Sequence, residues 1–164
     1  NDYSGEPGTG LEEGRPMFLR RPDSHLGLAN FMRSHLYASL ATLKIGLDIL
    51  LKEEDVKIDS ITGHGGLFKT KGVGQSILAA AMNAPISVME TAGEGGAWGM
   101  ALLAAYMLSK KDGQSLGDYL DSRVFAERKS ETMEPDLADV AGFETYTKQY
   151  QACLAAEKAA VQAF

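Results

Sequence analysis

The amino-acid sequence predicts an α/β fold that is mostly helical and contains a small sheet. Two short segments with strand character, residues 56–62 and 85–89, are each followed by a glycine-rich loop and then by a helical pattern. This alternation of strands and helices is typical of a sheet layered with helices. Apolar residues make up 45% of the 164 residues, which suffices for one domain with a buried core over residues 1–164.

A long helix is predicted after an irregular N-terminal segment. Residues 1–23 contain glycine and proline too often for regular structure, except for a short extended piece at residues 17–19. Ser24 is a typical residue for a helix start. From Leu26 to Glu53, apolar residues recur at steps of three, four or seven, which is the period of a helix with one buried stripe.

The first strand, the first glycine loop and a short helix are expected next. Residues 56–62 (VKIDSIT) alternate between apolar and polar side chains, as strands with one buried face do. The loop TGHGGLFKT overlaps the end of this strand, at residues 62–70. Apolar residues on one side of the segment 71–83 then predict a helix.

The second half of the chain begins in the same order. Residues 85–89 (PISVM) form the second predicted strand, and the loop ETAGEGG leads into the helical segment AWGMALLAAYMLSKK, residues 97–111. Because this helix is apolar on nearly every side, we expect it to be buried on most faces. Three further segments follow, a helix over 115–125, a polar loop over 126–136 and a last helix from Leu137 to about Ala163.

Two strands alone make a marginal sheet, so further strands are expected from elsewhere. The sequence begins NDYSGEPGTG, without an initiator methionine. We therefore expect the chain to be a piece of a longer protein whose upstream part supplies those strands. Without the upstream part, apolar surface on the long helix at 26–53 or at the sheet edge would be exposed, which would favour self-association.

Charge and cysteine content exclude several classes of protein. The net charge of −6 argues against nucleic-acid binding, which needs a basic face. No apolar run reaches the roughly 20 residues that span a bilayer, which argues against a membrane protein. The single cysteine, Cys153, allows no internal disulfide and suits a cytoplasmic location. His25, His35 and His64 are too scattered for zinc-ligand spacing, so no metal site is predicted.

The first glycine loop is a candidate anion site. Glycine lets a ligand approach the main chain, and backbone N–H groups at a strand-to-helix turn favour negative charge. Gly65 and Gly66 are the pair expected against a phosphate, with Lys69 adding charge and Thr70 a hydroxyl. A tight turn without any ligand explains the same residues equally well at this point.

The second glycine loop, GEGGAWG at residues 93–99, does not fit a dinucleotide-binding fingerprint. Trp98 stands where that fingerprint needs glycine or alanine, and no acidic strand follows. Because both loops follow neighbouring strands, we expect them to form two walls of one pocket. Gln75, Ala79 and Ala80 have the small or polar side chains expected in such a wall.

The run from Gly65 to Ala104 resembles the nucleotide-binding part of FGGY-family carbohydrate kinases. It shares with them a Gly-Gly pair, Thr70 four residues later, a glutamine in the next helix, and Glu94 before a helix rich in glycine and alanine. The helical stretch ANFMRSHLYASLATLKIG resembles a second signature of the family. The resemblance implies nucleotide contacts at Gly65, Gly66, Leu67, Lys69, Thr70, Gln75, Glu94 and Gly95.

The resemblance also implies a fold and an activity. The chain would be the C-terminal domain of an actin-like (ribonuclease H-like) ATPase, without the N-terminal domain that binds the sugar. Such a kinase transfers the γ-phosphate of ATP to a sugar, here expected to be the ketopentose xylulose or ribulose. Mg²⁺ would be held mainly by the missing domain, and no catalytic residue is assigned to this chain, which alone is expected to be inactive. The alternative is an actin-like nucleotide sensor or assembly module without sugar chemistry.

Overall fold

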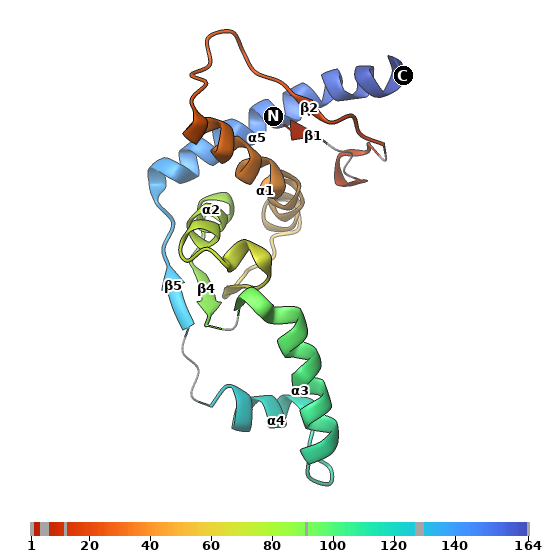
Figure 1. Ribbon diagram of the computed structural model, residues 1–164, viewed down its shortest axis with the longest axis vertical. Coiled ribbons are helices and arrows are strands. Elements are labelled where there is room, and N and C mark those ends of the chain that lie inside the picture. Colours follow the sequence, from red (N-terminus) through yellow and green to blue (C-terminus); the bar gives the residue numbers. More distant parts are fainter. Residues whose placement is uncertain (1, 4–6, 12, 91, 127–129, 164) are drawn as a thin grey trace. The chain divides into compact units, whose positions relative to one another are not determined.

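The computed structural model describes residues 2–3, 7–11, 13–90, 92–126 and 130–163 (Figure 1). The chain packs as two compact units. Unit 1 comprises residues 1–59, 77–84 and 135–164, and unit 2 comprises residues 60–76 and 85–134. The expected single domain over the whole chain stays a prediction, and each unit is described here by itself.

Two long helices form the frame of unit 1. Helix α1 (Leu28–Lys52) and helix α5 (Leu137–Ala163) contact each other, which confirms both helices predicted from periodicity. Strand β1 (Asp2–Tyr3) precedes these helices in the sequence and pairs antiparallel with strand β2 (Met17–Phe18). A short 3₁₀ turn, η1 (Pro7–Thr9), lies between the two strands along the chain. Strand β2 corresponds to the extended piece predicted at residues 17–19.

Aromatic side chains hold α1 against α5. The Tyr37 ring lies 4.6 Å from Phe143 and 5.3 Å from Tyr146, measured between ring centroids. Tyr37 and Phe143 are buried, and the Tyr146 hydroxyl donates a hydrogen bond to the carbonyl of Ser34 at 3.3 Å. Cys153 is half-buried and packs against the core residues Ala41 and Tyr150. Each such aromatic pair stabilises the unit beyond the area it buries.

One charged group of α1 is also buried. The Lys44 side chain is only 8% exposed, and its Nζ lies 2.6 Å from Oδ1 of Asp48. Lys52 reaches the other oxygen of the same carboxylate at 3.1 Å. Burial alone would raise the pKa of Asp48, but the hydrogen bonds and charges of Lys44 and Lys52 lower it below its ordinary value.

Unit 2 contains a three-stranded mixed sheet in the order β3–β4–β5 (Figure 1). Strands β3 (Ile61–Gly63) and β4 (Ile86–Met89) are parallel, and helix α2 (Val73–Met82) connects them. Strand β5 (Ser130–Met133) pairs antiparallel with β4. Parallel neighbours need such a crossover, because their ends lie at opposite edges of the sheet.

The structure corrects the sequence predictions of strands at two places. The strand expected over 56–62 is restricted to its end, at β3, and residues 56–60 lie outside the sheet. The segment 126–136, predicted to be a loop, contains β5. Because β5 (SETM) is polar and largely exposed at the sheet edge, it lacks the apolar alternation that identifies half-buried strands.

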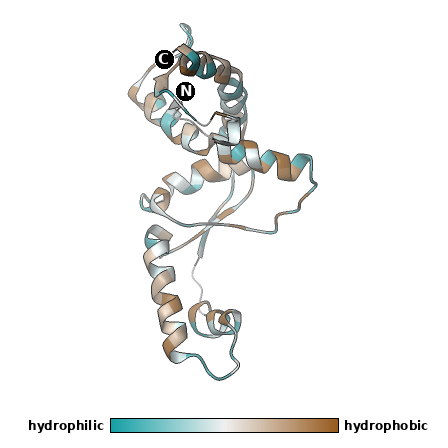
Figure 2. Ribbon diagram, turned by 90° about the vertical axis from the view of Figure 1, so that its right-hand side faces the viewer, coloured by the Kyte–Doolittle hydropathy of each residue, from teal (hydrophilic) through white to brown (hydrophobic). Residues whose placement is uncertain are grey.

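Helix α3 (Gly95–Ser109) forms where predicted, but it is not buried on most faces. Trp98 lies 6.0 Å from Phe125 and Tyr106 lies 5.4 Å from Tyr119, so one side packs against the following helical turns. The opposite side is exposed and apolar along its length (Figure 2), with Met107 76% exposed. Among the described residues of unit 2, the helical elements that follow α3 are short: α4 (Leu116–Tyr119) and the π-helical turn η4 (Leu120–Val124).

We expect Asp48→Asn to destabilise unit 1 by about 1–3 kcal/mol, because the buried Lys44 ammonium then loses its charged acceptor. The lowered pKa of Asp48 means that this stabilisation is present above the unfolded-state pKa of about 3.9 and is lost as pH falls through the folded-state pKa. Urea unfolding at neutral pH and at decreasing acidic pH measures both effects. The exposed Asp59→Asn is the matched control, and equal losses in both variants would contradict the prediction.

Candidate functional site

The two glycine loops lie together at one edge of the sheet in unit 2. Because β3 and β4 are parallel, the loops that follow them leave from the same end of the strands. The N–H of Gly65 in the first loop donates a hydrogen bond to the carbonyl of Ala92 in the second, at 2.7 Å. Short 3₁₀ turns shape both loops, η2 (Gly66–Phe68) in the first and η3 (Ala92–Glu94) in the second.

Packing explains some of these glycines. A Cβ atom on Gly63 would overlap the ring of Phe68, and a Cβ atom on Gly74 would overlap the backbone of Leu67. Gly65 has a φ of 109°, a conformation that side chains other than glycine rarely adopt. Gly63 and Gly65 thus require glycine for the turn itself, and Gly74 for the close packing of α2 against Leu67.

Packing does not explain Gly66. It is exposed, its φ lies outside the left-handed region, and no atom lies within 4 Å of the position that its Cβ would take. The described part of the chain therefore has room for a side chain here. The backbone of Gly66 is open to an approaching group, which is the property that a phosphate loop needs.

An ion pair joins the two loops. Nζ of Lys69 lies 2.7 Å from Oε1 of Glu94, and the two side chains are 59% and 73% exposed. Exposed pairs of this kind contribute at most about 1 kcal/mol, so an incoming anion can open this one at little cost. A Cβ atom on Gly93 would lie 3.1 Å from Cγ of Lys69, so glycine at this position leaves room for the lysine stem.

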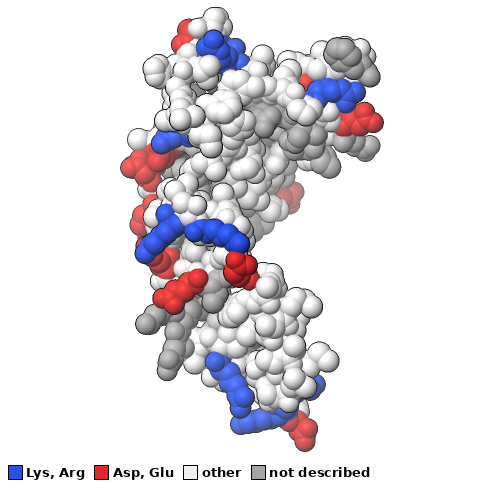
Figure 3. Space-filling view, viewed as in Figure 1, with Lys and Arg blue, Asp and Glu red and all other residues white. Residues whose placement is uncertain are grey.

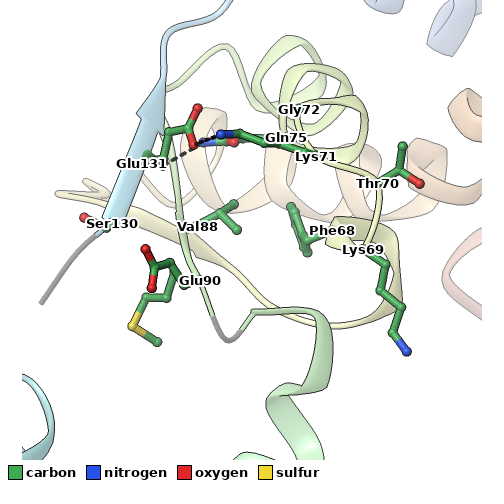
Figure 4. A pocket seen from close by; sticks show the side chains of 11 residues that line it. Phe68, Lys69, Thr70, Lys71, Gly72, Gln75, Val88, Glu90, Ser130 and Glu131 are labelled. Atoms are coloured by element: carbon green, nitrogen blue, oxygen red, sulfur yellow. Dashed lines mark hydrogen bonds and ion pairs between the residues drawn. The ribbon is translucent and has the colours of Figure 1, made fainter.

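A cavity of about 410 Å³ opens beside the first loop (Figure 4). This volume is within the usual range for small-molecule sites. Figure 4 shows Phe68 and Val88 pointing toward each other inside it, while Lys71 reaches Glu131 with an Nζ–Oε2 distance of 3.1 Å. The lining residues are Phe68, Lys69, Thr70, Lys71, Gly72, Gln75, Val88, Met89, Glu90, Ser130 and Glu131.

Gln75 supports the wall of this cavity. It is 5% exposed, and its Nε2 donates to the carbonyls of Ile86 at 2.7 Å and Glu131 at 2.8 Å. The side chain thus ties β4 and β5 to the start of α2, and its Oε1 remains as an acceptor. A nucleotide contact by Gln75 stays a prediction. Ala79 and Ala80 are buried and do not line this cavity, where they were expected as wall residues.

The predicted contact residues fall into two groups. Lys69, Thr70 and Gln75 line the cavity, whereas Gly65, Gly66, Leu67, Glu94 and Gly95 lie on the loops beside it. The sequence did not single out Lys71, Glu90, Ser130 or Glu131. Two of these belong to β5, which the sequence pattern assigned to a loop, so no signal placed them near the site.

Three general observations bear on the type of site. Among the described residues, no three His, Cys, Asp or Glu side chains come together as metal ligands. None of the described helices is long and apolar enough to cross a bilayer. On the face seen in Figure 3, acidic and basic side chains are interspersed and form no continuous basic patch.

Comparison with known proteins yields one match. The sequence model for the C-terminal domain of the FGGY family of carbohydrate kinases matches residues 1–108. The matched range contains both glycine loops and ends within α3. No curated protein and no solved structure matches the chain significantly.

We expect Gln75→Leu to destabilise unit 2 by about 1–3 kcal/mol, because the carbonyls of Ile86 and Glu131 lose a buried donor. Denaturant unfolding measures the stability, and hydrogen exchange should show weaker protection at β5. Ser76→Ala, which removes a hydroxyl that bonds only to its own helix, is the matched control. Unchanged stability and protection in the Gln75 variant would show that the strands do not depend on this side chain.

Proposed function

The chain belongs to the FGGY family of carbohydrate kinases, and we propose that it forms the ATP-binding part of an enzyme that phosphorylates a ketopentose. The observation that carries this proposal is the open backbone at Gly66. The backbone conformation requires glycine at position 65, but neither conformation nor packing requires it at position 66. Family membership supports the actin-like ATPase fold for the parent enzyme. The same membership supports ATP with Mg²⁺ as the phosphoryl donor.

The proposed nucleotide lies with its phosphates on the first glycine loop. The Gly65–Gly66 backbone offers close approach, and Lys69 exchanges its exposed partner Glu94 for a phosphate oxygen. Thr70 and the cavity beside it accommodate the rest of the nucleotide. Leu67, Gln75, Glu94 and Gly95 complete the set of proposed contacts.

Phosphoryl transfer by such an enzyme depends on positioning and on electrostatic stabilisation of the transferred group. In this proposal the described loops hold the ATP, while Mg²⁺ neutralises charge on its phosphates. The sugar hydroxyl and the group that accepts its proton lie outside this chain. The free thiol of Cys153 and the acidic net charge agree with a cytoplasmic enzyme that binds no nucleic acid.

The identity of the sugar as a ketopentose is the more specific part of the proposal. It rests on the residues of the two glycine loops, GHGGLFKT and GEGGAWG, which resemble the loop sequences of pentulose kinases. An actin-like sensor or assembly module would bind nucleotide in the same loops without transferring phosphate to any sugar.

We expect Gly66→Val in the full-length protein to raise the KM for ATP by about tenfold or more, because a branched side chain would occupy the space of the phosphate. The KM for the sugar should change little. Gly99→Val is the matched control, since no atom lies within 4 Å of its Cβ position either. Wild-type values for ATP in a correctly folded Gly66 variant would make the loop a turn without a ligand.

We further expect the full-length protein to release ADP with xylulose or ribulose well above the rate without sugar, and the 164-residue chain alone to show no turnover. The reason is that the proposed sugar site lies outside these residues. A coupled ADP assay with both pentuloses, with fructose and with glycerol measures the preference. Turnover with a different sugar would refute the ketopentose, and nucleotide binding without any acceptor would favour the sensor or assembly module.

A further inference from the structure

We propose that His64 is a phosphate-contacting residue of the nucleotide site, in which its imidazole donates a hydrogen bond to the bound phosphates. The proposal rests on the proposed function, since it needs a nucleotide on the first glycine loop. His64 stands between Gly63 and Gly65, and consecutive Cα atoms are about 3.8 Å apart. A phosphate at Gly65 and Gly66 is therefore within reach of its side chain.

The second glycine loop sets the position of the imidazole. A Cβ atom on Gly95 would lie 3.3 Å from both Cβ and Nδ1 of His64, closer than side chains normally pack. Glycine at position 95 thus leaves room for the Nδ1 side of the ring. His64 as a residue is exposed, so solvent or a ligand can reach its side chain.

The lysines near the first loop are already paired with carboxylates, which makes His64 a candidate for the phosphate contact. Both lysines of the first loop have carboxylate partners, Lys69 with Glu94 at 2.7 Å and Lys71 with Glu131 at 3.1 Å. Within the described residues, His64 forms no such pair. A protonated imidazole has two N–H donors, and charge-assisted bonds to phosphate are roughly twice as strong as neutral ones. A phosphate contact by His64 therefore requires no existing ion pair to break.

A purely structural His64 would fill the space over Gly95 and do nothing else. The two roles differ in their dependence on pH and on the ligand. Because a charged imidazolium binds phosphate more strongly than a neutral imidazole, a phosphate contact is stronger at low pH than at high pH. The other charged groups on and beside these loops are Lys69, Lys71, Glu90, Glu94 and Glu131. A packing role affects ATP and adenosine alike at every pH.

The test compares the wild-type full-length protein with His64→Gln, using calorimetry with ATP and with adenosine at about pH 6 and about pH 8.5. We expect His64→Gln to weaken ATP binding about tenfold at the lower pH and less than about threefold at the higher pH. Adenosine affinity and thermal stability should not change. His25→Gln is the matched control, because His25 is an exposed histidine of unit 1.

A double-mutant cycle with Gly95→Ala adds a second measurement. Gly95 is itself a proposed nucleotide contact, so the cycle isolates the part of its effect that depends on His64. The new Cβ would displace the imidazole, and we expect Gly95→Ala to weaken ATP binding less once His64 is glutamine. Additive effects, or equal losses for ATP and adenosine, would overturn the proposal. If Gly66→Val weakens ATP binding while His64→Gln does not, the proposed function stands and the role of His64 is refuted. If neither variant changes ATP binding, both fail.

Discussion

The parallel pairing of β3 with β4 is the constraint on which the candidate site depends. With Ile61 beside Ile86 and Gly63 beside Val88, both strands end at the same edge, and both glycine loops must start there. The hydrogen bond from Gly65 to Ala92 is a consequence of this register, as is the ion pair between Lys69 and Glu94. A shift by one residue would turn the side chains to the other face and separate these partners.

The third strand, β5, forms part of the cavity beside the two loops. Strand β5 supplies Ser130 and Glu131 to the lining, and Gln75 holds it against β4 through two backbone carbonyls. A buried amide with both N–H groups bonded has a fixed orientation, so the start of α2 and the two strands form one rigid wall. Gln75 thus fixes the position of the strand that supplies polar residues to the cavity. In the sequence alone, Gln75 is recognisable only as a glutamine in a predicted helix.

The periodic elements were predictable from the sequence, and the contacts between them were not. Helices α1 and α5 carry apolar residues at helical spacing, a local signal that survives folding. Strand β5 has no such signal, because an exposed edge strand takes its structure from the neighbour it pairs with. Helix α3 shows the opposite case: its apolar composition predicts burial, but burial depends on the elements available to cover it.

The glycines of the first loop show why the sequence can indicate where a site lies but not which role each of its residues has. All of them look alike in TGHGGLFKT, yet Gly63 makes room for Phe68, Gly65 permits a left-handed turn, and Gly66 meets neither need. Only the three-dimensional neighbours separate these roles. Gly66 is thus a glycine of this loop that neither packing nor backbone conformation requires, near a lysine whose exposed partner is easily displaced. The proposed nucleotide contact rests on this observation together with membership of a carbohydrate-kinase family.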